Sequence, residues 1–196
     1  MTMRTLRAVS LALGLGAAAS CSDSADNGDS GGQPGPVGSQ CATDSDCAGY
    51  SNPTCLTRLR PLETLIAPDA GEAGDVFKML DIPFPGGYCS NTIENSCLTD
   101  ADCGTGGGCY RPLTGVPADT LANLDAAVGV FSVTDFASKG LCLVPCESDS
   151  DCRADEGYEC HIPLEGFISV VNPAYTSTYC AQPVDVSYLL LPGDAG

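Results

Sequence analysis

One cysteine phrase occurs three times in this sequence, and it consists of two cysteines separated by five residues, two of which are aspartates. The copies begin at Cys41, Cys97 and Cys146, and each is followed by a third and a fourth cysteine. A Pro-Leu pair follows each third cysteine, so the agreement extends beyond the cysteines. Such self-similarity predicts three tandem modules. Their cysteines are Cys41, Cys47, Cys55 and Cys89, then Cys97, Cys103, Cys109 and Cys142, then Cys146, Cys152, Cys160 and Cys180.

The composition predicts that these cysteines form disulfides. The 196 residues include 13 Cys, 14 Pro and 23 Gly but no Trp, which is poor material for one large apolar core. Disulfides replace missing core in small exported domains, where each contributes about 2–4 kcal/mol, and they persist in oxidising compartments. We therefore predict an exported, small disulfide-rich fold, with three tandem cysteine-stapled modules built from short β-hairpins, short helical turns and irregular loops.

The pairing within a module has three alternatives, because four cysteines can pair in three ways. Cysteines six positions apart on a helical turn point in divergent directions and would seek different partners. This favours bonds from the first cysteine to the third and from the second to the fourth. The sequence by itself leaves the other two patterns open.

The paired aspartates of the phrase are candidate calcium ligands. Calcium takes six to eight oxygens, whereas each phrase supplies two carboxylates and lacks the glycine of a complete EF-hand loop. A Thr or Ser precedes the first aspartate of each pair, and this pattern favours a helix cap or an Asx-turn formed by that aspartate. We prefer this structural interpretation to calcium, for which other acidic side chains or carbonyls would have to complete a site. The six residues are Asp44, Asp46, Asp100, Asp102, Asp149 and Asp151.

No motif in the sequence predicts an enzyme or a cofactor. The Cys-x5-Cys spacing differs from that of a zinc knuckle, and His161, the only histidine, aligns with Tyr110 as a variable position of the module. The sequence contains no Gly-x-Ser-x-Gly elbow, phosphate-binding loop, dinucleotide fingerprint or His-Glu-x-x-His zinc helix. A carboxylate pair for glycoside hydrolysis remains the catalytic alternative among the 25 acidic residues. We expect a non-catalytic protein.

The first twenty residues have the three parts of a signal peptide, namely a basic start, an apolar stretch over residues 8–19 and small residues at the end. The next residues complete the run Ala18-Ala-Ser-Cys21, which resembles the lipobox of bacterial lipoproteins except that Leu is usual in place of Ala18. The resemblance implies that Cys21 carries acyl chains such as palmitate and tethers the protein to a membrane. The cysteine count agrees, because the modules use twelve of thirteen. Ordinary cleavage after Ala19 is the alternative.

The charge of the chain restricts its partners. With 25 acidic residues against 8 basic ones, the net charge of −17 excludes a nucleic-acid partner and suits a solvated surface protein. Residues 21–40 are almost without apolar side chains, so we predict that they form a flexible linker between the lipid anchor and the modules.

The segments between the third and fourth cysteines, here called the inserts, differ most between modules, and we expect specific recognition there. In the first insert an apolar run covers residues 76–84. In the second we predict a helix over residues 121–127, capped by Asp119 or Thr120, and a strand over residues 130–133. In the third we predict a strand over residues 167–171 that returns toward residues 176–179. A final apolar run over residues 186–191 is expected to pack against the third insert.

The module, Cys-x-x-Asp-x-Asp-Cys followed by a third cysteine, resembles the short cysteine-rich repeats of bacterial surface lipoproteins and is faintly similar to the Dickkopf amino-terminal cysteine-rich type. The resemblance covers residues 41–180 and implies extracellular, non-catalytic modules, but it carries over no functional residue. We expect an exported lipoprotein, anchored through Cys21 to the bacterial outer membrane or cell surface, that binds an unknown protein or envelope partner or has a structural role. A calcium-dependent adhesion module and a stapled inhibitor of an extracellular protease are the functional alternatives. A soluble periplasmic or secreted protein is the alternative location.

The cysteine spacing divides the chain into segments. We expect a signal peptide at residues 1–20, the lipid-anchored linker at 21–40, the modules at 41–96, 97–145 and 146–182, and a C-terminal strand or tail at 183–196.

Overall fold

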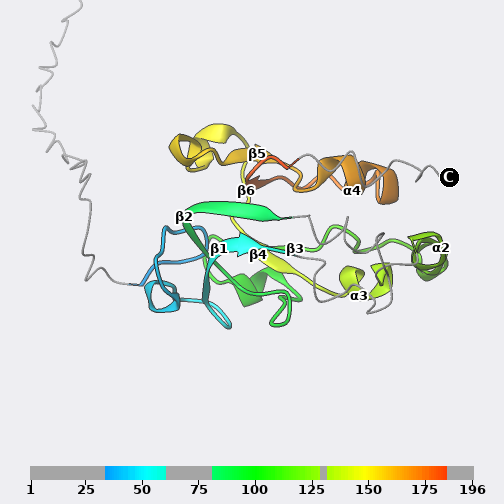
Figure 1. Cartoon of the computed structure of the whole chain (residues 1–196), viewed down its shortest axis with the longest axis horizontal. Coiled ribbons are helices and arrows are strands. Elements are labelled where there is room, and N and C mark those ends of the chain that lie inside the picture. Colours follow the sequence, from blue (N-terminus) through cyan, green and yellow to red (C-terminus); the bar gives the residue numbers. More distant parts are fainter. Residues whose placement is uncertain (1–33, 61–80, 129–131, 185–196) are drawn as a thin grey trace, which may run out of the picture. The chain divides into compact units, whose positions relative to one another are not determined.

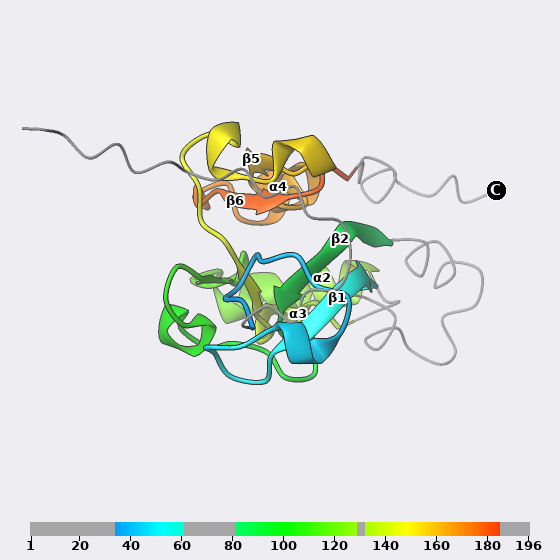
Figure 2. The same ribbon diagram turned by 90° about the vertical axis from the view of Figure 1, so that its left-hand side faces the viewer.

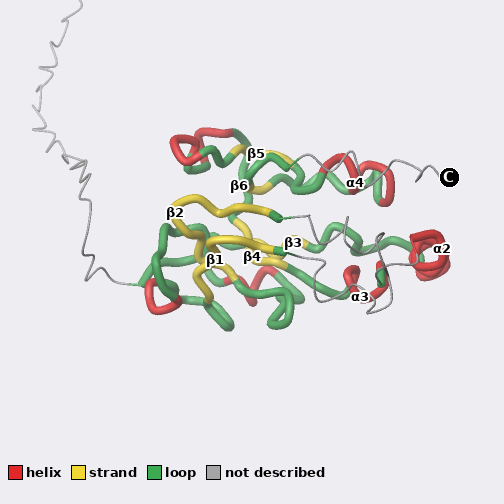
Figure 3. Tube along the Cα trace, in the orientation of Figure 1, coloured by secondary structure: helices red, strands yellow, loops and turns green. Residues whose placement is uncertain are grey.

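The computed structural model describes residues 34–60, 81–128 and 132–184, and each module within them contains one antiparallel β-hairpin (Figure 1). In every hairpin the third cysteine of the module lies directly opposite the fourth. Turns and loops make up most of the rest of the described chain (Figure 3), so the predicted small disulfide-rich fold is confirmed. The hairpins pair β1 (Thr54–Leu59) with β2 (Ile82–Ser90), β3 (Gly108–Tyr110) with β4 (Leu141–Leu143), and β5 (Glu159–His161) with β6 (Tyr179–Ala181).

The cysteine phrase folds into a short 3₁₀ turn in all three modules. These turns are η1 (Asp44–Asp46), η2 (Asp100–Cys103) and η3 (Asp149–Asp151), and a further turn, η4 (Ala154–Glu156), follows η3. Each of the first three turns contacts the first strand of its own hairpin. In each phrase the first cysteine lies three residues before the turn, and the second lies at its end or directly after it.

Six disulfides connect the turns to the hairpins, and they confirm the pairing of first to third and second to fourth cysteine. The first cysteine of the phrase bonds to the opening strand of the hairpin and the second to the returning strand, so each module is closed on itself. The first-to-third bonds are Cys41–Cys55, Cys97–Cys109 and Cys146–Cys160. The second-to-fourth bonds are Cys47–Cys89, Cys103–Cys142 and Cys152–Cys180.

The second insert contains the predicted helix, although its start differs. Helix α2 (Ala118–Val128) begins three residues before the predicted range of 121–127, directly after Pro117. Asp119 and Thr120 therefore lie in the first turn of the helix rather than at its N-cap. Proline before the helix suits this start, because a missing N–H and a fixed φ cost nothing at that position.

Two predicted strands differ from the structure. Of the predicted strand over residues 130–133, residues 129–131 lie outside the described part, and Ser132 caps the short helix α3 (Val133–Ala137). The prediction is wrong at this end, because a serine that accepts a backbone N–H favours the start of a helix over an extended run. The predicted return strand over 176–179 shortens to its last residue, which begins β6.

The predicted strand over residues 167–171 is wrong, because this segment forms helix α4 (Glu165–Val171), which lies beside β5 and β6 of its own module (Figure 2). Leu164, Ile168 and Val171 are all buried, and their spacing places them on one face of a helix. Burial of this apolar face outweighs the β-preference of the branched side chains. The hairpin that holds the cysteines already supplies the strands of the module.

The three modules share one large hydrophobic core, and a second small cluster holds Cys41, Cys47 and Cys89 of the first module. The fully buried members of the large core include Tyr88 from the first module, Leu143 and Val133 from the second, and Tyr158 and Ile168 from the third. The apolar residues of each insert therefore bury one another across module boundaries. Since each module alone could bury little apolar area, the shared core is expected to make folding of the three cooperative.

A buried polar link fixes the first module against the second. Asn91 is 1% exposed, its Oδ1 accepts the N–H of Cys142 at 2.6 Å, and its Nδ2 donates to the carbonyls of Gly140 at 3.0 Å and Asn95 at 2.9 Å. The neighbouring Ser90 hydroxyl donates to the carbonyl of Cys142 at 2.6 Å. Buried polar groups satisfied in this way specify one arrangement of the two modules.

Residues 34–40, which the sequence places in the linker, pack on the first module. Val37 is 5% exposed and belongs to the shared core. The N–H of Gly38 donates to the carbonyl of Cys89 at 2.9 Å, and the N–H of Cys89 donates to the carbonyl of Ser39 at 3.0 Å. In the described chain the folded part thus includes residues ahead of the first module cysteine.

Candidate functional site

The first aspartate of each phrase holds the hairpin of its own module. Its Oδ1 accepts the backbone N–H of the third cysteine at 2.8 Å in all three modules, and this cysteine lies on the opening strand of the hairpin. The contact therefore joins the turn to the strand in the same place where a disulfide joins them covalently. The pairs are Asp44 with Cys55, Asp100 with Cys109 and Asp149 with Cys160.

The second aspartate performs the capping that the sequence assigns to the first. Asp46 Oδ2 accepts the N–H groups of Ala42 and Thr43, both at 2.8 Å, and Asp102 and Asp151 do the same in their modules. The carboxylate thus satisfies donors that the short turn leaves free. These backbone hydrogen bonds hold the pKa of each of the three carboxyls below its ordinary value. The assignment of the cap to the first aspartate is therefore wrong by two positions, although both residues accept backbone N–H bonds.

The calcium alternative gains no support from the described residues. Each carboxylate of the phrase has a backbone N–H partner, which is the structural role preferred from the sequence. Within the described part of the chain, the groups of three or more ligand-type side chains that converge consist of cysteines. All of these cysteines are bonded in disulfides, so their sulfurs are not thiolate ligands.

His161 occupies a structural position at the start of the third insert. Its Nδ1 lies 3.1 Å from the carbonyl oxygen of Ile162 and its Nε2 lies 3.2 Å from that of Ala181. The half-buried ring therefore bridges β5 and β6. This environment matches its alignment with a structural tyrosine, Tyr110, in the second module.

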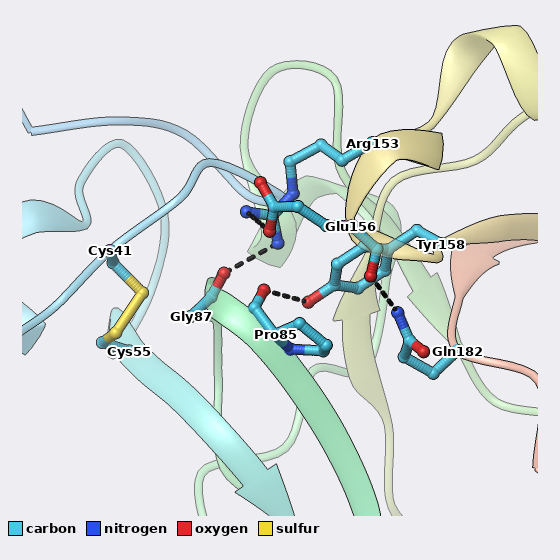
Figure 4. Close-up of polar contacts among 8 residues, drawn as sticks. All are labelled: Cys41, Cys55, Pro85, Gly87, Arg153, Glu156, Tyr158 and Gln182. Atoms are coloured by element: carbon cyan, nitrogen blue, oxygen red, sulfur yellow. Dashed lines mark hydrogen bonds and ion pairs between the residues drawn. A yellow bond between two sulfur atoms is a disulfide. The ribbon is translucent and has the colours of Figure 1, made fainter. Parts of the chain in front are cut away.

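The third module is fastened to the first by Arg153, a residue that none of the sequence-based expectations names (Figure 4). Its guanidinium pairs with Glu156 at 3.1 Å and donates to the carbonyl of Gly87 at 2.7 Å. The same group lies over the rings of Tyr158 and Tyr88, 4.5 Å and 5.5 Å from their centroids. A cation held between aromatic faces and a carboxylate is a stabilising arrangement when partly buried, and both charged side chains are 22% exposed.

Three further features support this junction. The hydroxyl of Tyr158 donates to the carbonyl of Pro85 at 3.1 Å, and Gln182 donates to the carbonyl of Glu156 at 2.9 Å (Figure 4). Gly87 has φ of +73°, and a Cβ there would lie 2.0 Å from the carbonyl oxygen of Cys41, so only glycine fits. One sequence signal exists for the junction, since a basic residue follows the second cysteine only in the third module.

The tyrosine that precedes the fourth cysteine of the first module connects all three modules. Tyr88 is 1% exposed, its hydroxyl accepts the N–H of Val144 at 3.0 Å, and it donates to the carbonyl of Cys180 at 3.4 Å. Burial raises the pKa of Tyr88 to about 12. In the second module the Tyr110 hydroxyl donates to the carbonyl of Pro163 in the third.

The bases of the three inserts meet around one apolar cavity of about 40 Å³. Leu59 and Ile82 line it where the first insert leaves and rejoins its hairpin, Phe136 and Lys139 line it from the second insert, and Leu164 lines it from the third. The sequence predicts recognition by the inserts, and the three inserts meet at this one location. We call this feature the apolar cavity.

Several predicted features lie outside the described residues. They are the lipid-acceptor candidate Cys21, the signal peptide at residues 1–20, most of the first insert and the final apolar run over residues 186–191. No protein-family model, curated protein or solved structure matches the chain significantly. The chain is a cysteine-rich protein of tandem disulfide-bonded modules.

Proposed function

We propose that the protein is a non-catalytic lipoprotein of the bacterial envelope, which displays its three modules as one stapled body for binding or for a structural role. The observation that carries this proposal is the set of six disulfides, because bridges at this density indicate an exported protein. No helix among the described residues is long and apolar enough to cross a bilayer. Attachment to a membrane would then depend on the lipid that the lipobox resemblance assigns to Cys21.

The shared core supports a role in binding. The cysteine phrase, its aspartates and the hairpins are alike in all modules and have internal partners, so they act as scaffold. The inserts differ between modules, and their bases meet at the apolar cavity. Variable segments held together by a rigid scaffold are a common arrangement for recognition.

The anchor is tested by replacing its one acceptor. Cells producing the wild-type chain, Cys21→Ser or the neighbouring control Ser22→Ala are labelled with a palmitate analogue and separated into membrane and soluble fractions. We expect label and membrane attachment for the wild type and the control, and neither for Cys21→Ser. A Cys21→Ser chain that stays in the membrane fraction, or a wild type without label, contradicts the anchor.

The binding role is tested by capture from native envelope. The exported Cys21→Ser chain is immobilised through an added C-terminal tag and exposed to envelope extract, and a second sample is first reduced and alkylated. We expect a component retained by the disulfide-bonded chain and lost from the reduced one. If the two samples retain the same components, binding does not depend on the folded modules.

A further inference from the structure

A second hollow adjoins the apolar cavity, and two arginines and one glutamate are among the residues that line it. Leu56, Arg58, Arg60, Thr92 and Glu94 line it, and it shares Leu59 and Ile93 with the apolar cavity. We call it the arginine hollow. Its two guanidinium groups pair with one carboxylate, because Asp81 lies 3.2 Å from Arg58 and 3.9 Å from Arg60.

The cationic side chains of the described residues concentrate at these two hollows. Arg58, Arg60 and Lys139 line them, which leaves Arg111 and Arg153 elsewhere in the described part of a chain with a net charge of −17. Arg111 donates to the carbonyl of Leu98 and Arg153 belongs to the junction of modules, whereas Arg58 and Arg60 share Asp81. Glu94 also lines the arginine hollow, so its two arginines face two carboxylates, and Lys139 is the cation at the hollows without a carboxylate partner among the described residues.

Lys139 has a particular position in this arrangement. Its side chain is half-buried against the apolar cavity, and no described residue forms an ion pair or side-chain hydrogen bond with it. It follows the last turn of α3, where the backbone N–H of Lys139 donates to the carbonyl of Phe136, so the backbone of the lysine is held in place. A half-buried ammonium beside an apolar surface favours an anionic partner that also has an apolar part.

We propose that the two hollows form one docking site for an acidic peptide segment of a partner protein, which places an aliphatic side chain in the apolar cavity and carboxylates against Lys139 and Arg58. A cavity of about 40 Å³ holds roughly three waters, which is the size of one aliphatic side-chain tip. The apolar lining supplies affinity and the cations select charge, whereas the remaining acidic surface repels acidic segments elsewhere. This inference rests on the proposed binding role and names its site and partner class.

The test uses a short synthetic peptide and the exported full chain with Cys21→Ser, so it does not depend on lipid attachment. The probe is acetyl-Ser-Glu-Leu-Asp-Ser-amide, and two matched peptides replace both acids by Gln and Asn, or the Leu by Ser. Binding is followed by amide signals of Phe136, Leu141 and Leu143 in two-dimensional NMR spectra at low salt. We expect saturable shifts with the probe and weaker binding of both matched peptides.

A charge-matched pair of protein variants locates the contact. Lys139→Gln is expected to weaken probe binding by roughly threefold to fivefold, the effect of one half-exposed ion pair. Arg111→Gln changes the net charge equally and lines neither hollow, so binding should be unchanged. Equal effects of the two variants would overturn the proposal, and so would equal binding of the neutral peptide.

Two other occupants are tested in the same experiment. If the full chain fails to bind the probe but a chain ending at Asp185 binds it, the cavity belongs to the chain's own C-terminal run, and the proposal is overturned. If vesicles containing phosphatidylglycerol bind at these signals and the peptide does not, the partner is a lipid surface, and the proposal is likewise overturned. Either result leaves anchoring through Cys21 and capture from envelope to be judged separately.

Discussion

The substitution Asn91→Ala tests whether the modules are joined into one body. Asn91 is 1% exposed and makes three close hydrogen bonds, of which those to Cys142 and Gly140 cross from the first module to the second. Each bond contributes about 1 kcal/mol, and the buried N–H of Cys142 would be left without its partner at a further cost of about 1–2 kcal/mol. With the small cavity added to these contributions, we expect the free energy of unfolding to fall by about 4–6 kcal/mol.

The measurement is chemical denaturation of the disulfide-intact exported chain, followed by tyrosine fluorescence and circular dichroism. Asn95→Ala is the matched control, because this exposed side chain contributes no side-chain hydrogen bond to the link, and we expect it to change stability by less than about 0.5 kcal/mol. A loss below about 1 kcal/mol for Asn91→Ala would refute the reasoning. Two separate transitions in the wild type would refute the shared core.

Three further perturbations test the scaffold. The capping carboxyls have lowered pKa values in the folded chain, so their stabilisation is present above the unfolded value near 3.9 and is lost as the pH falls below about 4. These carboxyls belong to Asp46, Asp102 and Asp151. Denaturation midpoints measured between pH 6 and pH 2 should therefore fall at the acid end, and they should fall less steeply in a variant with all three residues changed to Asn. The same slope in the variant and the wild type would contradict their role. Arg153→Met should cost about 2–3 kcal/mol, because Glu156 is left partly buried without its partner, and thermal denaturation showing no loss would count against the junction. Gly87→Ala should cost more than about 2 kcal/mol because its Cβ meets the Cys41 carbonyl, whereas Gly106→Ala, at φ +83° in open space, should cost about 1 kcal/mol; equal midpoints in urea would contradict this.

The sequence predicts the features that repeat. The three cysteine phrases indicate the number of modules, their hairpins and, through the divergence of cysteines on a turn, the pairing that the structure confirms. The helix in the second insert is also predictable, because Asp119 and Thr120 are typical of a helix start, although the helix begins at Ala118. These features depend on local geometry, which one module contains in full.

The parts that escape prediction depend on contacts between modules. Residues 167–171 are rich in branched residues typical of strands, yet Ile168 and Val171 turn a helical face to the shared core. Arg153 is a single residue outside the repeat pattern, and it contacts Gly87 and Tyr88 in another module. The apolar cavity also depends on contacts between modules, since its lining comes from all three inserts.

The exchange of roles between the aspartates has a local cause that the sequence does not reveal. Both Asp44 and Asp46 can accept N–H bonds in a turn, and the preceding Thr43 suits a cap in either case. The choice is made by the opening strand, whose Cys55 N–H lies within reach of the first carboxylate and is 2.8 Å from it. Sequence spacing alone cannot place that strand, because the third cysteine follows at different distances in different modules.

Disulfide mapping of the exported chain tests the central claim most directly. The protein is alkylated without reduction, digested with pepsin at low pH to prevent exchange, and analysed by mass spectrometry. We expect six bonds that stay within modules and join first to third and second to fourth cysteines, with Cys21 in none of them. Alkylated module cysteines, bonds between modules or a bond from first to second cysteine would contradict it.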